Sequence, residues 1–352
     1  MIKKISLFIL TGIISQIVFS QEADSTKKKS AFTITGSVDG YYRYNFNNPK
    51  KSPYNSFTSF TRSGNSFELG MASLRADHSF GKVSATIDLG FGNRAEEFAY
   101  NDANTRFAIK QAYLGYAPSA KIKFTLGTWG THIGYELLDP YLNRNYSMSY
   151  KFTNGPFSHT GLKADIGLGG KSALMIGISN PTDYRSAPAM PKSVIAQFST
   201  ASKDNKLKLY FNFVGGKQSD IKKLAQSDIV ATYTVTSKFN AGFNGTLQSV
   251  KLTDSTGKSA TSTWSGAALY LNVDPLNWFG LTLRAEYIGD KDQYLGLKNV
   301  FAPTLSANFK IDNLIIIPEF RFDNAGNAVF YKNATAATRS TGSFILAATY
   351  HF

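Results

Sequence analysis

The 352-residue chain contains no cysteine, which excludes a disulfide scaffold, a thiolate metal site, a cysteine nucleophile and a lipid-anchored N-terminal cysteine. Its 4 histidines are too few for most multi-histidine metal sites. Charged residues make up 18% of the chain, below the roughly 25% of soluble domains. After residue 20, no apolar run approaches the ~20 residues that a membrane-spanning helix needs. We therefore expect no metal site, no cofactor and no bundle of membrane helices.

Aromatic residues and glycine are abundant, with 27 Phe, 19 Tyr and 29 Gly. The net charge is +14, from 38 basic and 24 acidic residues. An excess of basic over acidic residues also occurs in nucleic-acid-binding proteins. Here, however, the basic residues are spread along the chain, and the one cluster is 27–29. The composition therefore favours a β-rich membrane protein without a nucleic-acid partner.

The first twenty residues have the pattern of an export signal. Lys3 and Lys4 precede an apolar stretch, and 18–20 then offers permissive side chains for cleavage. An uncleaved anchor helix fits less well, because the apolar stretch is short and its flanks are wrong. We expect a signal peptide at 1–20 removed after Ser20, a flexible polar segment at 21–31, and one barrel domain at 32–352.

Apolar and polar side chains alternate along the rest of the chain with a period of two, the period of β-strands. In 206–213 the apolar residues occupy the odd positions, and in 341–352 they lie mainly on the even ones. A soluble β-sandwich would also alternate. These segments are longer than the ~5–6 residues of soluble strands, and they carry aromatic residues at the ends of their apolar faces, as membrane barrels do.

The alternating segments and their connections predict an all-β, transmembrane antiparallel β-barrel of about sixteen strands. The expected strands are 32–46, 67–80, 82–91, 107–117, 121–130, 159–168, 172–180, 192–201, 206–216, 227–237, 240–253, 264–273, 278–289, 300–309, 313–323 and 341–352. Short and long connections alternate between them, as do the periplasmic turns and external loops of outer-membrane barrels. A barrel of this size leaves an aqueous channel.

Polar side chains on these strands should point into the lumen. Opposite charges lie two residues apart on one face at four places, and two lysines of one strand have no such partner. The expected pairs are Arg75 with Asp77, Lys163 with Asp165, Arg284 with Glu286, and Glu319 with Arg321, and the unpaired lysines are Lys121 and Lys123. These charges either set the field that passing solutes feel or only hydrate and stiffen the wall.

The longest connection, 131–158, is a candidate constriction loop, since long loops in compact folds are commonly functional. If it folds inward, several of its side chains should line the narrow part of the pore against Lys121 and Lys123. These are Tyr135, Glu136, Asp139, Arg144 and Tyr146. Its composition fits an ordinary external loop equally well.

The chain ends on Phe352, an aromatic residue that closes an alternating strand. This ending resembles the signal recognised by the outer-membrane barrel assembly machinery. It predicts Phe352 as an assembly signal.

The chain resembles the putative β-barrel porin family of Gram-negative outer-membrane proteins in its signal peptide, its alternating strands, its terminal Phe and a central stretch, and the likeness covers nearly the whole mature chain. The residues that carry this resemblance are Gly134, Tyr135, Glu136, Asn143, Asn145, Tyr146, Ser147, Pro156, Phe157, His159, Thr160 and Gly161. The resemblance implies a porin-like channel in the outer membrane. Members of this family often carry Arg between two Ser after the Tyr, where this chain has Met148. The departure removes a cation near the expected constriction and leaves charge selectivity open.

These observations predict a porin for passive diffusion of small hydrophilic solutes or ions, with a mild anion preference and no enzymatic activity. Its expected partners are outer-membrane lipid, the assembly machinery and further copies of itself. Two alternatives remain: a structural or adhesive barrel whose external loops bind a ligand, and a barrel hydrolase that uses serine and histidine. Conductance separates the first from a channel, and hydrolysis assays separate the second.

Overall fold

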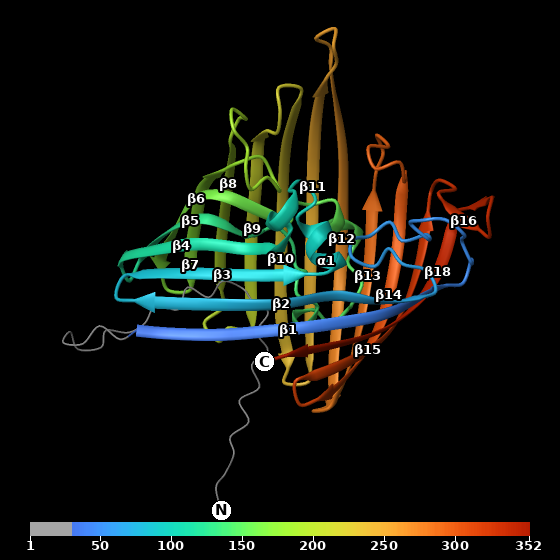
Figure 1. The fold of residues 1–352 in the computed structure, drawn as a ribbon, viewed down its shortest axis with the longest axis horizontal. Helices are drawn as coiled ribbons and strands as arrows, with labels where there is room; N and C mark the ends of the chain where they lie inside the picture. Colours follow the sequence, from blue (N-terminus) through green and yellow to red (C-terminus); the bar gives the residue numbers. More distant parts are fainter. Residues whose placement is uncertain (1–29) are drawn as a thin grey trace, which may run out of the picture.

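The computed structural model describes residues 30–352, which form a closed antiparallel barrel of sixteen strands (Figure 1). The expected signal peptide at 1–20 lies outside the described residues, as does nearly all of the segment 21–31. The strands pair in chain order, and β1 (Ser30–Asn45) closes the ring by pairing with β18 (Ser340–His351). The predicted fold class is confirmed.

The remaining barrel strands follow the predicted ranges closely. They are β2 (Ser66–Phe80), β3 (Val83–Phe91), β4 (Ile109–Ser119), β5 (Ile122–Gly130), β6 (Ser158–Gly169), β7 (Ser172–Ser179), β8 (Ser193–Ala201), β9 (Leu207–Lys217), β10 (Lys222–Thr236), β11 (Phe239–Thr253), β12 (Ser259–Leu276), β13 (Phe279–Gly289), β14 (Asn299–Ile311) and β15 (Leu314–Ala325). A hairpin of β16 (Phe330–Lys332) and β17 (Ala336–Thr338) lies in the last external loop.

Four short helices lie in the external connections: α1 (Asn93–Phe98), η1 (Asn104–Ala108), η2 (Pro140–Leu142) and α2 (Tyr150–Thr153). None of the helices in residues 30–352 has the length and apolarity needed to cross a membrane.

The two faces of each strand separate as the alternation predicts. Phe211, Leu283 and Leu346 are exposed on the outer wall, whereas Asn212 and Arg284 on the same strands are buried inside. In a membrane, the outer face contacts lipid, so its exposed apolar side chains are stabilised there rather than penalised.

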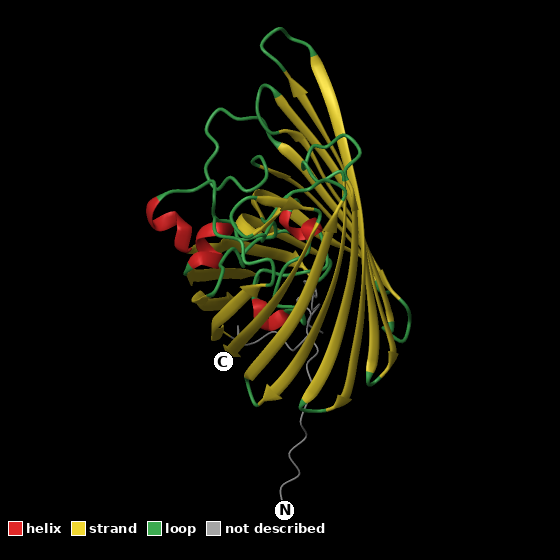
Figure 2. Cartoon of the chain, turned by 90° about the vertical axis from the view of Figure 1, so that its right-hand side faces the viewer, coloured by secondary structure: helices red, strands yellow, loops and turns green. Residues whose placement is uncertain are grey.

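External connections fill much of the inside of the barrel. Figure 2 shows loops and short helices gathered within the curve of the strands. Several apolar clusters form where these loops meet the inner wall, and one of them joins Tyr146 to Tyr41, Ile317 and Ile345. The core therefore lies between the loops and the wall, on the inner side of the sheet.

Candidate functional site

Residues 131–157, between β5 and β6, cross the inside of the barrel. The backbone N–H of Gly134 donates to Asp228 Oδ1 of β10 (3.1 Å), and the Tyr146 hydroxyl donates to Asp39 Oδ2 of β1 (2.6 Å). Because β1 and β10 lie far apart around the ring, these contacts place the loop in the lumen rather than above it.

The middle of this loop, residues 146–151, is held through its backbone by buried carboxylates. Glu319 of β15 accepts hydrogen bonds from the N–H groups of Tyr146 (2.8 Å) and Ser147 (3.1 Å). Hydrogen bonds to an ionised acceptor are about twice as strong as those between neutral groups. The wall therefore fixes the path of the backbone and not only its side chains.

Two further glutamates hold the next turn of the same segment. Glu286 of β13 accepts from the N–H groups of Tyr150 (2.8 Å) and Lys151 (2.9 Å). Glu136, in the loop itself, accepts from the N–H of Ser149 (2.8 Å). Five backbone N–H groups of residues 146–151 thus donate hydrogen bonds to three carboxylates.

The carbonyl groups of the same segment face two arginines. Arg284 Nη1 donates to the Ser147 carbonyl and to Glu136 Oε1, both at 2.6 Å. Arg321 Nη1 donates to the Met148 carbonyl (2.7 Å). Positive and negative wall groups are therefore matched to the carbonyl and amide groups of the loop.

Two of the expected lumen pairs are corrected by this arrangement. Arg284 pairs with Glu136 of the loop rather than with Glu286, and Arg321 of β15 pairs with Asp323 (2.8 Å) rather than with Glu319. The physical reason is that the loop amides occupy both glutamates. The side chains expected to face water do point inward, but the loop covers them.

The remaining expected pairs form on β2 and β6 and are better hydrated. Arg75 and Asp77 of β2 are 2.6 Å apart, with side chains 28% and 38% exposed. Lys163 and Asp165 of β6 are 3.5 Å apart. By contrast, the Arg284 side chain is 0% exposed. The loop thus covers the charges of β13 and β15 that hold its backbone, and it leaves the two pairs on β2 and β6 partly accessible.

The structure does not bring Lys121 and Lys123 to the loop. Lys121 is exposed in the turn before β5. Lys123 lies opposite Asp165 in the register of β5 and β6, and its side chain reaches Gly115 of β4. The basic residues expected near the acidic loop therefore lie farther along the passage.

Asp139 and Arg144 of the loop each have an ionic partner on the wall. Arg144 holds Asp274 at 2.8 and 2.9 Å, and Lys310 reaches the same carboxylate at 2.7 Å. Asp139 accepts from Lys110 (2.6 Å). Because these charges are paired, they contribute less net field to the lumen than the sequence suggests.

Tyr135 packs against the wall through an aromatic contact. Its ring stacks on Tyr270 of β12, with centroids 4.1 Å apart. A Cβ at Gly242 of β11 would lie 2.6 Å from the Tyr135 ring. A side chain at this glycine would displace the ring and weaken the attachment of the loop.

The external loops meet in an apolar cluster next to the same segment. Its buried members are Phe60, Phe98, Met148, Phe152 and Phe157. The guanidinium of Arg94, from α1, lies over the rings of Phe60 (4.8 Å) and Tyr146 (5.0 Å), and Nη1 contacts the sulfur of Met148 (3.7 Å). Sequence reasoning missed Arg94, because nothing in its local pattern indicates burial. The Arg94 guanidinium thus places a positive charge beside Met148, although Met148 itself is neutral.

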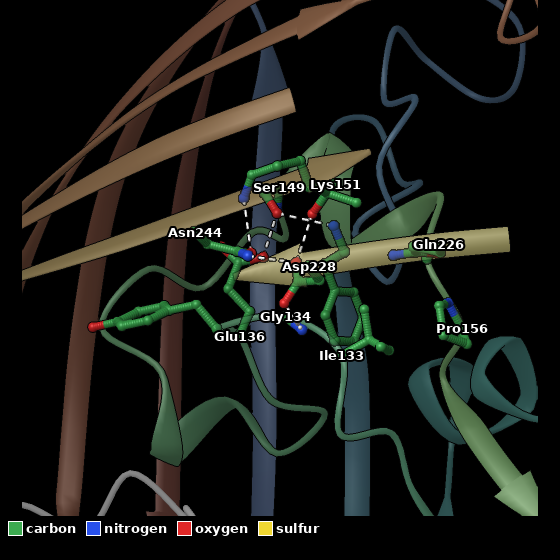
Figure 3. Close-up of a pocket in the computed structure, with 13 residues that line it drawn as sticks. Ile133, Gly134, Glu136, Ser149, Lys151, Pro156, Gln226, Asp228 and Asn244 are labelled. Carbon is green, nitrogen blue, oxygen red and sulfur yellow. Dashed lines mark hydrogen bonds between the residues drawn. The ribbon is translucent and has the colours of Figure 1, made fainter. Parts of the chain in front are cut away.

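A small cavity of about 10 Å³ separates the loop from β10 and β11 (Figure 3), close to the room that one water needs. Lys151 Nζ donates to Asn244 Oδ1 (3.0 Å), and Asn244 Nδ2 donates to Asp228 Oδ2 (2.6 Å). Through Asn244, the buried lysine is therefore linked to a carboxylate of the wall.

Burial and charge partners shift the pKa values of the loop groups in opposite directions. Burial alone would raise the pKa of Glu136, but Arg284 and the Ser149 amide hold it below its ordinary value. Burial lowers the pKa of Lys151, against the opposing effect of Glu286. In the neighbouring external loop, burial raises the pKa of Asp183 to about 6. Glu136 is thus an ionised anchor, whereas Asp183 titrates in a moderately acidic range.

Phe352 lies at the seam where the barrel closes. Its backbone exchanges two hydrogen bonds of 3.0 Å with Gly36 of β1, and a Cβ at Gly36 would lie 2.5 Å from the Phe352 ring. The side chain is exposed on the outer wall. This placement leaves the ring accessible from the membrane side.

Comparisons with known proteins find relatives in family and fold. Residues 31–352 match the sequence model of the family described as "Putative beta-barrel porin-2, OmpL-like". A search of curated proteins finds no match.

Solved structures share the fold at low sequence identity. The outer membrane channel DcaP of Acinetobacter baumannii superposes with a TM-score of 0.64 and 12% identity, covering 92% of this chain and 97% of that one. An anion-selective porin from Comamonas acidovorans gives 0.60 and 12%, covering 92% and 100%. OmpT of Vibrio cholerae gives 0.59 and 9%, covering 93% and 99%. At these identities the likeness shows the fold alone.

Proposed function

Because the chain belongs to the putative beta-barrel porin-2, OmpL-like family, we propose that it forms a narrow outer-membrane channel for passive diffusion of small hydrophilic solutes, with a mild preference for anions. Family and fold support an outer-membrane channel in a Gram-negative bacterium. They are also typical of proteins without enzymatic activity.

The observation that carries the proposal is the unequal burial of the inner wall. On β13 and β15, the loop covers four charged side chains and forms hydrogen bonds with each of them: Arg284, Glu286, Glu319 and Arg321. On the side of β2–β8, Arg75 and Asp77 keep 28% and 38% of their side-chain surface. The passage therefore runs between the inward loop and the wall of β2–β8, with residues 131–157 as its constriction.

The anion preference rests on a lysine of this wall, Lys123 of β5, and on Lys208 of the adjoining strand β9. Lys123 and Lys208 point inward, are partly exposed, and have no ion pair within residues 30–352. Nearby, Asp77 is paired with Arg75, and Asp165 is paired with Lys163. Unpaired positive charges in a low-dielectric lumen attract anions more strongly than exposed surface charges do.

One observation favours the structural or adhesive barrel instead. The cluster of Phe60, Phe98, Met148, Phe152 and Phe157 ties external loops together inside the mouth. Loops locked in this way could present a rigid binding surface at the expense of conductance.

The proposal also includes the steps that bring the chain to the membrane. These are export through a signal peptide cleaved after Ser20, insertion by the barrel assembly machinery through Phe352, and association into a homo-oligomer. The aromatic ring of Phe352, accessible at the barrel seam, supports the second of these.

Single-channel recording in a salt gradient tests the function. The wild-type protein should give discrete current steps and a reversal potential on the anion side. Lys123→Gln with Lys208→Gln should move the reversal potential towards cations, whereas the control pair Lys258→Gln with Lys291→Gln, exposed in external loops, should leave it unchanged. A folded barrel that passes no current contradicts the channel and favours the adhesive alternative.

A further inference from the structure

Three lysines form a row across neighbouring strands. Lys223 of β10 stands directly opposite Lys217 of β9 and directly opposite Lys251 of β11. Direct cross-strand partners point to the same face with Cβ atoms about 5 Å apart. All three side chains are exposed. We call Lys217, Lys223 and Lys251 the lysine row.

The row lies on the outer wall of the barrel. Phe213 and Leu247, which share its face on β9 and β11, are exposed apolar side chains of the lipid-facing surface. The row is close to the connection 218–221, on the side of the long external loops. It therefore lies at the external edge of the apolar band, at the depth of the outer-leaflet headgroups.

No carboxylate neutralises the row within residues 30–352. None of its lysines forms an ion pair there, although surface pairs such as Lys206 with Asp204 occur elsewhere. Like charges that stand directly opposite each other destabilise a sheet. An anion bound to the row would relieve this repulsion.

A groove runs between these lysines. It has a volume of about 420 Å³, and its lining includes Ala225, Ser249 and Thr261 together with the three lysines. Ala225, Ser249 and Thr261 form the floor of the groove, and the aliphatic parts of the lysine side chains form its sides. Next to it, the Phe213 ring lies over Gly215, where a Cβ would be 2.6 Å from the ring.

Towards the membrane, a small side chain of β10 lies between two larger apolar ones of its neighbours. Ser227 of β10 stands opposite Phe213 on one side and Leu247 on the other. A small residue between two large apolar ones leaves a shallow channel along β10. Ser227 lies four residues from Lys223 on the same face of β10, between the lysine row and the apolar band.

We propose that the lysine row binds the phosphate group of an outer-leaflet lipid, with an acyl chain running over Ala225 and Ser227 between Phe213 and Leu247. Lysine ammonium groups bind phosphate as point charges, and clustered basic residues beside a membrane select anionic headgroups. The lysines would bind the phosphate group of such a lipid, and the small residues of β10 would hold its acyl chain. A free anion would contact the lysines alone. The site lies on the outer wall and not in the lumen. Its test therefore does not depend on whether the protein is a channel.

Native mass spectrometry of the detergent-solubilised full chain tests the site, with phosphatidic acid as the probe and phosphatidylethanolamine as the zwitterionic comparison. The test variant is Lys217→Gln/Lys223→Gln/Lys251→Gln. The matched control is Lys258→Gln/Lys291→Gln/Lys332→Gln, which removes the same charge from exposed loop positions. Heat-modifiability on gels verifies that both are folded.

Wild type and control should retain phosphatidic acid in preference to phosphatidylethanolamine, and the test variant should bind it at least tenfold more weakly, since each lysine beside an anionic surface contributes a factor of about five. Equal retention by the two variants overturns the proposal. So does competition by inorganic phosphate at the same concentration as the lipid, which would indicate a free-anion site.

Discussion

Arg284 of β13 and Glu136 of the inward loop form a salt bridge with Nη1 and Oε1 2.6 Å apart, and their side chains are 0% and 5% exposed. The pair joins the wall to the loop across 148 residues of sequence. Removing one member leaves the other charged and buried, which costs more than the pair itself contributes.

Single substitutions at this pair should therefore be strongly destabilising. Glu136→Gln and Arg284→Met should each cost about 3–5 kcal/mol, and the double variant should cost clearly less than the two together. Urea unfolding in micelles measures all three. As a control, Asp77→Asn breaks the half-exposed pair with Arg75 and should cost less. Additive losses would contradict a direct buried pair.

A charged side chain introduced on the outer wall should lower the unfolding free energy, whereas one introduced on the open side of the lumen should change it little. Leu283→Arg places a cation against lipid near the middle of β13 and should cost about 2–4 kcal/mol. Ser199→Arg, on the inner face of β8 where the side chain is partly exposed, should cost little. Equal losses in unfolding free energy would contradict the assigned faces.

The strands could be predicted from the sequence because each crosses the membrane with one apolar and one polar face. The predicted strand ends are wrong where the difference between the apolar and the polar face is weak. β10 begins at Lys222 instead of 227, and β12 spans Ser259–Leu276 instead of 264–273, because pairing continues into polar residues beyond the apolar band.

The site was less predictable, because its partners are distant in sequence. Spacing correctly suggested Arg75 with Asp77, which are neighbours on one strand. It could not indicate that Glu319 would bind loop amides, since backbone groups of a loop carry no sequence signal. The burial of Arg94 depends on three external connections meeting, which no single segment reveals.

The external loops should respond to acid through Asp183. Its Oδ1 accepts from the N–H groups of Phe157 (2.6 Å) and Ser158 (2.8 Å). Burial raises its pKa from 3.8 to about 6, so the folded state keeps a proton that the unfolded state has lost. This contribution to stability is complete below the unfolded pKa and disappears as pH rises through about 6.

Asp183→Asn should remove this pH dependence while keeping an oxygen acceptor for both amides. Between pH ~3 and ~7, the stability of wild type relative to the variant should fall by about 3 kcal/mol, from a shift of roughly two pKa units. Urea unfolding across this range measures the difference. A constant difference would show that Asp183 does not titrate there.

Loss of the terminal ring should impair assembly. Deletion of Phe352 removes both the exposed aromatic and its hydrogen bonds to Gly36 at the barrel seam. We expect a smaller fraction of heat-modifiable, membrane-inserted protein. Phe352→Tyr, which keeps the ring, should insert normally. Normal insertion of the deletion variant would show that the terminus has no part in assembly.

A conducting passage along the wall of β2–β8 can be tested directly with a single introduced cysteine, because the chain has no native cysteine. A Lys123→Cys variant is recorded in a planar bilayer while a bulky, positively charged thiol reagent is added. The amplitude of the discrete single-channel steps should fall on modification, whereas Leu283→Cys on the lipid face should show no change. Unmodulated current in the Lys123→Cys variant after verified labelling, or no current at all from folded protein, would contradict a passage along this wall.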